Sequence, residues 1–310
     1  MIAFVFPGQG SQKVGMGRAL AEAHPVCRQA FDEADAALGE PLSRLCFEGP
    51  EDQLVLTENT QPAILATSIA AYRLLVAKGL RPDFVAGHSL GEYSAHVAAG
   101  TMAFADALRI VRRRGRYMQE AVPVGQGAMA AVLGLSADKV EQACREASMG
   151  EVVSPANLNA PGQVVIAGAA AAVARAGDRA RALGARRVMA LNVSAPFHCA
   201  LMKPAQDRLE PELRALAVED PGIPVVANVD ALPKRDAAAA IEALVAQVSS
   251  PVRWEEVVHR LASEGVRTYV EVGPGMVLSG LVKKIVDDAA VFNIDHHLGT
   301  PAMEALFSQS

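Results

Sequence analysis

The feature that most constrains the fold is a short apolar run that ends in the pattern G-x-S-x-G, at residues 84–91. A helix-forming run, residues 92–99, follows at once. A serine on such a strand-to-helix turn exposes its hydroxyl, and the next backbone N–H is free to stabilise an oxyanion. Gly87 and Gly91 suit the turn, because side chains there would collide with neighbouring backbone. The pattern predicts Ser89 as a nucleophile. A serine in an ordinary turn of an α/β unit is the alternative at this point, because so short a motif also arises by chance.

Strand-like and helix-like runs alternate along most of the 310 residues, which predicts a mostly parallel sheet with helices on both faces. Residues 128–193 have a different order, β-α-β-β-α-β, which is typical of a ferredoxin-like unit. A chain of this length commonly divides its core. We therefore expect an α/β fold in which a ferredoxin-like small lobe, residues 124–198, is inserted into a large lobe made of residues 1–123 and 199–310.

Two further expectations concern the elements of the large lobe. The pair Gln61-Pro62 is expected to begin a long apolar helix that runs to about Lys78, because proline is favoured in the first turn of a helix. Residues 268–272 are expected to form the last clear strand.

Composition excludes several classes of protein. The net charge of −5 and the pI of about 5.8 argue against binding to nucleic acid or to an anionic membrane. The four cysteines are scattered without a C-x-x-C pair, so neither a zinc site nor a disulfide framework is expected. The longest uncharged run, residues 152–174, contains prolines and asparagines and is not expected to span a membrane. Because the chain opens directly with a strand, no signal peptide is expected, and the predicted location is the cytoplasm.

A glycine-rich loop, Pro7 to Gln12, follows the first predicted strand. Its spacing matches neither the dinucleotide-binding pattern, which would need glycine at position 13, nor the P-loop pattern. The loop can instead present backbone N–H groups beside a catalytic centre.

One arginine of the predicted helix 104–122 differs from its neighbours. At about 100° per residue, Arg114 falls inside the continuous apolar arc of the helix, whereas Arg112, Arg113 and Arg116 lie outside it. A guanidinium among apolar residues must find an anion, because an unpaired buried charge is too costly. That anion can be a structural carboxylate or a ligand, and both remain open here.

A serine hydroxyl needs a neighbouring base, most often histidine. His198 is the best candidate of the seven histidines, because it follows a proline at the second joint between the lobes, where a cleft is expected. His88 is adjacent to Ser89, but neighbouring side chains at a sharp turn point apart. A histidine that only packs at the joint is the alternative reading of His198.

These residues resemble one family, the malonyl-CoA:acyl carrier protein transacylases of bacterial fatty-acid synthesis. The likeness covers almost the whole chain and rests on several blocks in one order. They are FVFPGQGSQ (4–12), TQPAI (60–64), GHSLGEYSA (87–95), RGRYMQEAVP (114–123), NAPGQVVIAG (159–168), SAPFHCALM (194–202), SPVRW (250–254) and EVGPG (271–275).

The resemblance implies an α/β-hydrolase-like large lobe with the active site between the lobes, and it implies a role for several residues. Ser89 matches the nucleophile, His198 the base, and the N–H groups of Gln9 and Leu90 the oxyanion hole. Arg114 matches the residue that binds the malonyl carboxylate, and the main-chain carbonyl of Gln247 matches the group that orients the histidine. The cleft-facing Asn157 and Asn159 of the small lobe and Phe197, a residue associated with malonyl use, are weaker assignments.

The resemblance also implies the reaction and its partners: a monomeric [acyl-carrier-protein] S-malonyltransferase that moves malonyl from malonyl-CoA to holo acyl carrier protein, without metal or cofactor. Because carrier proteins are acidic, a basic rim is expected. Its candidates are Arg186, Arg187, Lys203, Lys283 and Lys284. Three alternatives stay open: an acyltransferase that loads a polyketide carrier protein, a serine thioesterase, and a non-catalytic scaffold.

Overall fold

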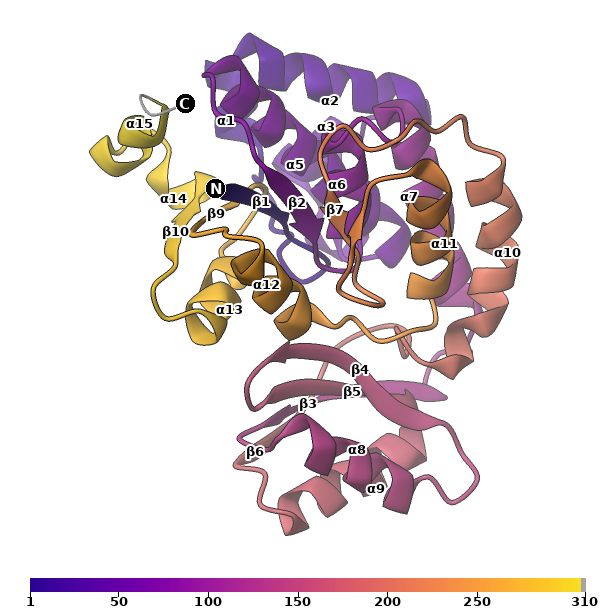
Figure 1. The fold of residues 1–310 in the computed structure, drawn as a ribbon. Helices are drawn as coiled ribbons and strands as arrows, with labels where there is room; N and C mark the ends of the chain where they lie inside the picture. Colours follow the sequence, from indigo (N-terminus) through magenta and orange to yellow (C-terminus); the bar gives the residue numbers. More distant parts are fainter. Residues whose placement is uncertain (308–310) are drawn as a thin grey trace.

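The structure, a computed structural model, describes residues 1–307, and the chain forms two lobes, one above the other in Figure 1. The large lobe is built on a six-stranded sheet with the strand order β10-β9-β1-β2-β7-β8. Adjacent strands are parallel except for β7 and β8, which are antiparallel. The strands are β1 (Ile2–Phe6), β2 (Phe84–Gly87), β7 (Val225–Val226), β8 (Pro233–Lys234), β9 (Thr268–Glu271) and β10 (Ala290–Asn293).

Helices cover both faces of this sheet, which is why β1 is apolar throughout. Ala3 and Val5 pack on the side of α12 and α13, and Phe4 and Phe6 pack on the side of α5 and α6. The helices of the large lobe are α1 (Arg18–Ala23), α2 (Pro25–Leu38), α3 (Leu42–Glu48), α4 (Glu51–Leu54), α5 (Thr57–Ala77), α6 (Gly91–Ala98), α7 (Phe104–Glu120), the 3-10 helix η1 (Ala200–Met202), α10 (Lys203–Arg214), α11 (Ala237–Gln247), α12 (Trp254–Ser263), α13 (Val277–Ile285), α14 (Ile294–His297) and α15 (Pro301–Phe307).

The small lobe has its own antiparallel sheet, with the strand order β4-β5-β3-β6. The elements, in chain order, are β3 (Gly127–Leu133), α8 (Ala137–Ala147), β4 (Val153–Ala160), β5 (Gln163–Ala169), α9 (Ala170–Ala182) and β6 (Arg187–Ala190). Both helices lie on the face turned away from the large lobe (Figure 1). The βαββαβ order expected from the sequence is therefore confirmed. Its predicted boundaries, residues 124 and 198, stay a prediction.

The opposite face of the small sheet continues into the core of the large lobe. Met129, Ala131 and Val165 belong to the same buried cluster as residues of α5 and α7. Backbone hydrogen bonds also join the lobes, because Leu158 N–H donates to Val252 O and Val252 N–H donates to Ala156 O, both at 2.9 Å. The two lobes are therefore held together both by a shared apolar core and by backbone hydrogen bonds.

Two expectations for the large lobe are wrong. Helix α5 begins at Thr57, one turn earlier than expected, so Pro62 lies inside the helix. A proline there removes one helical hydrogen bond. Helix α5 persists because it is buried along most of its length, and packing outweighs local propensity. The second error is β10, a four-residue edge strand that pairs with β9 beyond the last strand that the sequence predicts.

Residues 1–307 can be compared with two kinds of feature that the sequence argues against, a membrane-spanning helix and a metal site. No helix there is long and apolar enough to cross a membrane. The same residues contain no group of three or more His, Cys, Asp or Glu side chains that could hold a metal ion. The four cysteines are free and buried.

Candidate active site

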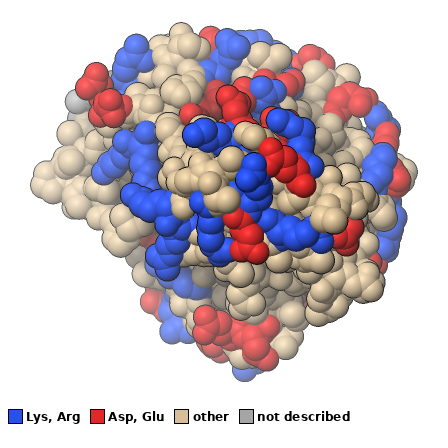
Figure 2. Space-filling view, turned by 90° about the horizontal axis from the view of Figure 1, so that it is seen from below, with Lys and Arg blue, Asp and Glu red and all other residues tan. Residues whose placement is uncertain are grey.

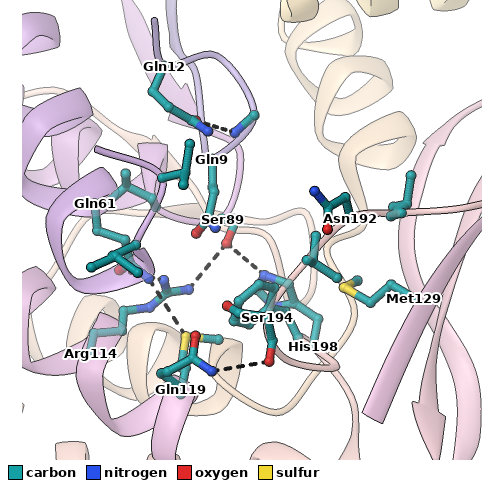
Figure 3. Close-up of a pocket in the computed structure, with 18 of the residues that line it drawn as sticks. Gln9, Gln12, Gln61, Ser89, Arg114, Gln119, Met129, Asn192, Ser194 and His198 are labelled. Atoms are coloured by element: carbon teal, nitrogen blue, oxygen red, sulfur yellow. Dashed lines mark hydrogen bonds between the residues drawn. The ribbon is translucent and has the colours of Figure 1, made fainter. Parts of the chain in front are cut away.

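A cavity of about 680 Å³ lies between the two lobes, and it brings together most of the residues singled out from the sequence (Figure 3). The large lobe contributes Ser89, Leu90 and Arg114, while the small lobe contributes Met129 and Asn157. The other lining residues are Gln9, Gly10, Gln12, Val55, Leu56, Gln61, His88, Met118, Gln119, Val124, Leu191, Asn192, Val193, Ser194, Phe197 and His198.

Ser89 sits at a strained turn between β2 and α6. Its φ is 53°, in the left-handed region that residues with a side chain rarely adopt. The two flanking glycines allow the turn: a Cβ on Gly87 would lie 1.9 Å from the backbone of Gly91, and a Cβ on Gly91 would lie 2.0 Å from Phe6 O. Any larger residue would therefore push β2, α6 and β1 apart.

Asn228 holds this turn from behind, and the sequence analysis missed it. The fully buried side chain accepts a hydrogen bond from Ser89 N–H at 2.7 Å and donates one to Gly87 O at 2.7 Å. Both bonds stabilise the unfavourable backbone of Ser89. No local pattern indicates this role, because Asn228 is 139 residues from Ser89 along the chain.

Ser89 and His198 form a hydrogen-bonded pair, with 2.6 Å between Oγ and Nε2. The other ring nitrogen, Nδ1, lies 3.0 Å from Gln247 O and 3.2 Å from Ser250 O. Because carbonyl oxygens only accept, Nδ1 must carry a proton, and Nε2 is left to accept the serine proton. His198 also has a left-handed backbone, with φ at 60°.

The charge state of the histidine suits a base. Burial, followed by the nearby positive charge of Arg114, lowers the pKa of His198 to about 3. The imidazole is therefore neutral at physiological pH and able to take a proton. The carbonyl oxygens of Gln247 and Ser250, which accept from Nδ1–H, stabilise the positive charge of the imidazolium that forms when Nε2 takes a proton.

Two backbone N–H groups near Ser89 are available for an oxyanion. The glycine-rich loop packs directly on the turn, because a Cβ on Gly8 would lie 2.4 Å from His88 O. The N–H groups of Gln9 and Leu90 donate no hydrogen bond within residues 1–307. Both residues line the cavity, and Figure 3 shows Gln9 beside Ser89. This arrangement gives an oxyanion two preorganised donors.

Arg114 is buried, with 1% of its surface exposed, and its guanidinium points at Ser89 (Figure 3). One terminal nitrogen, Nη2, donates to Ser89 Oγ at 3.2 Å and to the side-chain oxygen of Gln247 at 2.8 Å, while Nη1 donates to that of Gln61 at 2.9 Å. The guanidinium also lies over the Tyr93 ring, 5.3 Å from its centroid.

Its neighbours on α7 pair with carboxylates: Arg112 with Glu40, Arg113 with Glu212 and Arg116 with Glu58. Arg114 forms no ion pair within the described part of the chain, and burial lowers its pKa. The sequence left two partners open for Arg114, a structural carboxylate and a ligand. Among residues 1–307, no carboxylate pairs directly with Arg114. A buried cation held only by neutral groups is suited to bind an anionic ligand.

The two asparagines of the small lobe differ. Asn157 lines the cavity, whereas Asn159 Oδ1 lies 2.8 Å from His88 Nε2 and is not one of the lining residues. His88 is therefore bonded to the small lobe, and its ring makes no hydrogen bond to Ser89 within residues 1–307.

Comparisons with known proteins extend this picture. An acyl transferase domain family matches residues 3–300. The malonyl CoA-acyl carrier protein transacylase of Bacillus subtilis is 51% identical over 285 residues, which are 92% of this chain and 90% of that protein. The Escherichia coli K12 protein of the same name is 52% identical, over 92% of this chain and 93% of that protein.

Solved structures agree with these relatives. An acyl carrier protein S-malonyltransferase from Vibrio cholerae has a TM-score of 0.93 and 49% identity, covering 94% of this chain and 96% of that one. A malonyl-transacylase solved in complex with a type II polyketide acyl carrier protein has a TM-score of 0.95 and 47% identity, covering 100% and 99%. The chain therefore belongs to the acyl transferase family, among the malonyl CoA-acyl carrier protein transacylases.

Proposed function

We propose that this protein transfers the malonyl group of malonyl-CoA to the phosphopantetheine thiol of holo acyl carrier protein, through a malonyl ester on Ser89. The observation that carries the proposal is the Oγ atom of Ser89, which lies 2.6 Å from His198 Nε2 and 3.2 Å from the buried guanidinium of Arg114. A nucleophile, its base and a cation for the free malonyl carboxylate thus meet at one atom.

The first half-reaction loads the serine. His198 Nε2 takes the Ser89 proton as Oγ attacks the thioester carbonyl, and the oxyanion is bound by the N–H groups of Gln9 and Leu90. When the tetrahedral intermediate collapses, the carbon–sulfur bond breaks and His198 returns its proton to the sulfur of coenzyme A. Each N–H is worth on the order of 3 kcal/mol by comparison with other oxyanion donors.

The second half-reaction unloads it. His198 takes the proton of the phosphopantetheine thiol, the sulfur attacks the ester carbonyl, and the bond from that carbon to Ser89 Oγ breaks as Oγ regains a proton. All of these steps use only groups of this protein and the thiols of coenzyme A and phosphopantetheine. The proposal therefore includes no metal and no redox cofactor. We propose that Gln247 orients the base, through the carbonyl that accepts from His198 Nδ1.

Arg114 gives the site its acyl preference. Its guanidinium can form a bidentate, charge-assisted pair with the free carboxylate of the malonyl group. An acetyl group would leave that buried charge without a partner, so discrimination of about 10³ is expected, as at other sites that lose a required polar partner.

The carrier protein is expected to meet basic residues near the cavity. Lys203 is paired with Asp207 and is thereby partly neutralised. Lys284 donates to the neutral side chain of Gln163 and keeps its charge, and Arg187 is exposed on the edge strand β6. Figure 2 views the molecule from the side of the small lobe and shows Lys and Arg side chains grouped there, interspersed with acidic ones. We propose that the carrier protein docks on this basic surface. We further propose that the enzyme acts as a monomer and is located in the cytoplasm.

An acyltransferase that serves a polyketide carrier protein is a second candidate, favoured by the similarity to the transacylase solved with such a partner. A serine thioesterase is disfavoured, because that mechanism normally has a carboxylate behind the histidine. Here Nδ1 of His198 faces two carbonyl oxygens instead.

The test compares acceptors and acyl groups. The protein is mixed with malonyl-, acetyl- and methylmalonyl-CoA and examined by intact mass spectrometry, and each adduct is then offered water, a fatty-acid holo carrier protein or a polyketide one. We expect a malonyl adduct that is stable to water and is discharged by holo carrier protein. Rapid hydrolysis with no transfer would contradict the proposal, and the relative rates with the two carrier proteins decide the pathway.

A further inference from the structure

The Gln247 side chain lies between groups of opposite hydrogen-bonding character. Its oxygen, Oε1, accepts from Arg114 Nη2, and an arginine can only donate. Its nitrogen, Nε2, donates to Ser89 O at 2.9 Å and to Glu92 Oε2 at 2.7 Å. A flipped amide would set donor against donor at Arg114, so these partners fix one orientation.

Glu92 is the carboxyl of that set, and the mechanism above gives it no role. It is the second residue of α6 and has no exposed surface, directly behind the nucleophile turn. Oε2 accepts from Gln247 and from the backbone N–H of Asn228 at 3.0 Å, while Oε1 has no hydrogen-bond partner. A buried carboxyl is costly to keep, so its presence calls for a functional explanation.

The charges around this carboxyl indicate what it does. Besides burial, two charged groups shift its pKa: Asp230 raises it, and Arg114, which is connected to the carboxyl through the Gln247 amide, lowers it. Glu92 and Arg114 make no direct contact; the amide of Gln247 connects them. The terminal nitrogens of Arg114 are therefore not paired with a carboxylate. The hydrogen bonds from Arg114 to Gln247 and from Gln247 to Glu92 still hold the guanidinium in place.

We propose that Glu92 is a positioning residue that acts through the Gln247 side chain to hold the Arg114 guanidinium in the orientation that receives the acyl carboxylate. This inference rests on the proposed function, because it assigns Glu92 to the same carboxylate site. Its consequence is a selective one: Glu92 matters for a substrate with a free carboxylate and much less for acetyl-CoA, which does not use Arg114.

The test measures single-turnover acylation of Ser89 by malonyl-CoA and by acetyl-CoA in four full-length proteins: wild type, Glu92→Ala, Glu92→Gln and Ser94→Ala. Ser94 is the matched control, because it is a buried polar residue of the same helix whose hydroxyl has no partner. Thermal unfolding of each protein separates loss of the fold from loss of selectivity.

For Glu92→Ala we expect the kcat/KM for malonyl-CoA to fall about 10²-fold, since small misplacements of a binding group have effects of that size. The rate with acetyl-CoA should change much less, so the malonyl-to-acetyl ratio narrows. Glu92→Gln should retain most of the ratio, because an amide oxygen can accept both hydrogen bonds. Ser94→Ala should match wild type.

Three results would overturn the inference: equal losses with both substrates in Glu92→Ala, an unchanged ratio in that variant, or a ratio as poor in Glu92→Gln as in Glu92→Ala. If Glu92→Ala does not fold, Glu92→Asp replaces it, because the shorter side chain withdraws the acceptor from Gln247 and should narrow the ratio too. Failure of the proposed function has a separate signature, namely that wild type itself shows no malonyl adduct or no preference over acetyl.

Discussion

The two walls of the cavity differ in how firmly their side chains are held. On the large-lobe wall Ser89 and Arg114 are joined by a hydrogen bond, and both are bonded to Gln247, which is fully buried behind the wall. On the small-lobe wall Met129 and Asn157 are buried, but the loop after β6 is more open: Leu191 and Val193 are only partly buried, and Asn192 is exposed. The difference indicates that the large lobe holds the reacting groups in fixed positions, whereas the small lobe shapes the space around the acyl and pantetheine chains.

Of the substitutions on the large-lobe wall, removal of the Ser89 hydroxyl should reduce kcat the most. Ser89→Ala is expected to lose on the order of 10⁶-fold in kcat, as do serine hydrolases that lose a nucleophile. Intact mass spectrometry after mixing with malonyl-CoA checks the cause, and His198→Ala serves as the comparison that keeps the hydroxyl. A malonyl adduct on the Ser89→Ala protein would show that another residue carries the acyl group.

The next largest loss of activity should follow removal of the Arg114 guanidinium, on the same wall. Arg114→Ala is expected to lower kcat/KM for malonyl-CoA by about 10³-fold and to narrow the preference over acetyl-CoA, because only malonyl has a carboxylate to bind. Arg113→Ala, which removes a surface ion pair on the same helix, is the control. Retention of the malonyl preference in Arg114→Ala would refute the carboxylate role.

The buried carboxyl behind that wall should be visible in the pH dependence of stability. Burial raises the pKa of Glu92 from 4.5 to about 7. Between these values the unfolded chain releases the proton while the folded protein keeps it, so Glu92 lowers the free energy of unfolding as pH rises. Glu92→Gln does not titrate.

Relative to wild type, the free energy of unfolding of Glu92→Gln should therefore rise by about 3 kcal/mol from pH 4.5 to pH 8. Urea denaturation at several pH values measures the difference, with Ser94→Ala as the control. A difference that stays constant over this range would mean that the carboxyl titrates normally in the folded protein.

The small-lobe wall should respond least. Asn192 is exposed, so Asn192→Ala is expected to change kcat/KM for malonyl-CoA by no more than about twofold, the size typical of surface substitutions. Steady-state transfer to holo carrier protein checks this. A loss above tenfold would contradict the division between the two walls.

Local patterns predicted the parts of the site that depend on one stretch of chain. The turn at Ser89, the inward face of Arg114 and the joint at His198 follow from spacing and periodicity, and the βαββαβ order of the small lobe follows from alternating runs. Gln247 came only from the family resemblance, because its contribution is a backbone carbonyl, which any residue could supply.

The parts that depend on tertiary contacts escaped prediction. Asn228 and Glu92 read as ordinary polar residues in sequence, and only the fold brings them to the back of the turn. The left-handed backbone of His198 and the proline inside α5 are likewise fixed by surrounding structure.

The most direct test of the fixed large-lobe wall is a crystal structure of the acylated enzyme, prepared by soaking with malonyl-CoA. We predict an ester on Ser89 Oγ, its carbonyl oxygen on the N–H groups of Gln9 and Leu90, and its carboxylate paired with Arg114, with Gln247 still bound to Glu92. A carboxylate directed at the small lobe or at solvent, with Arg114 held only by glutamine side chains, would contradict the account.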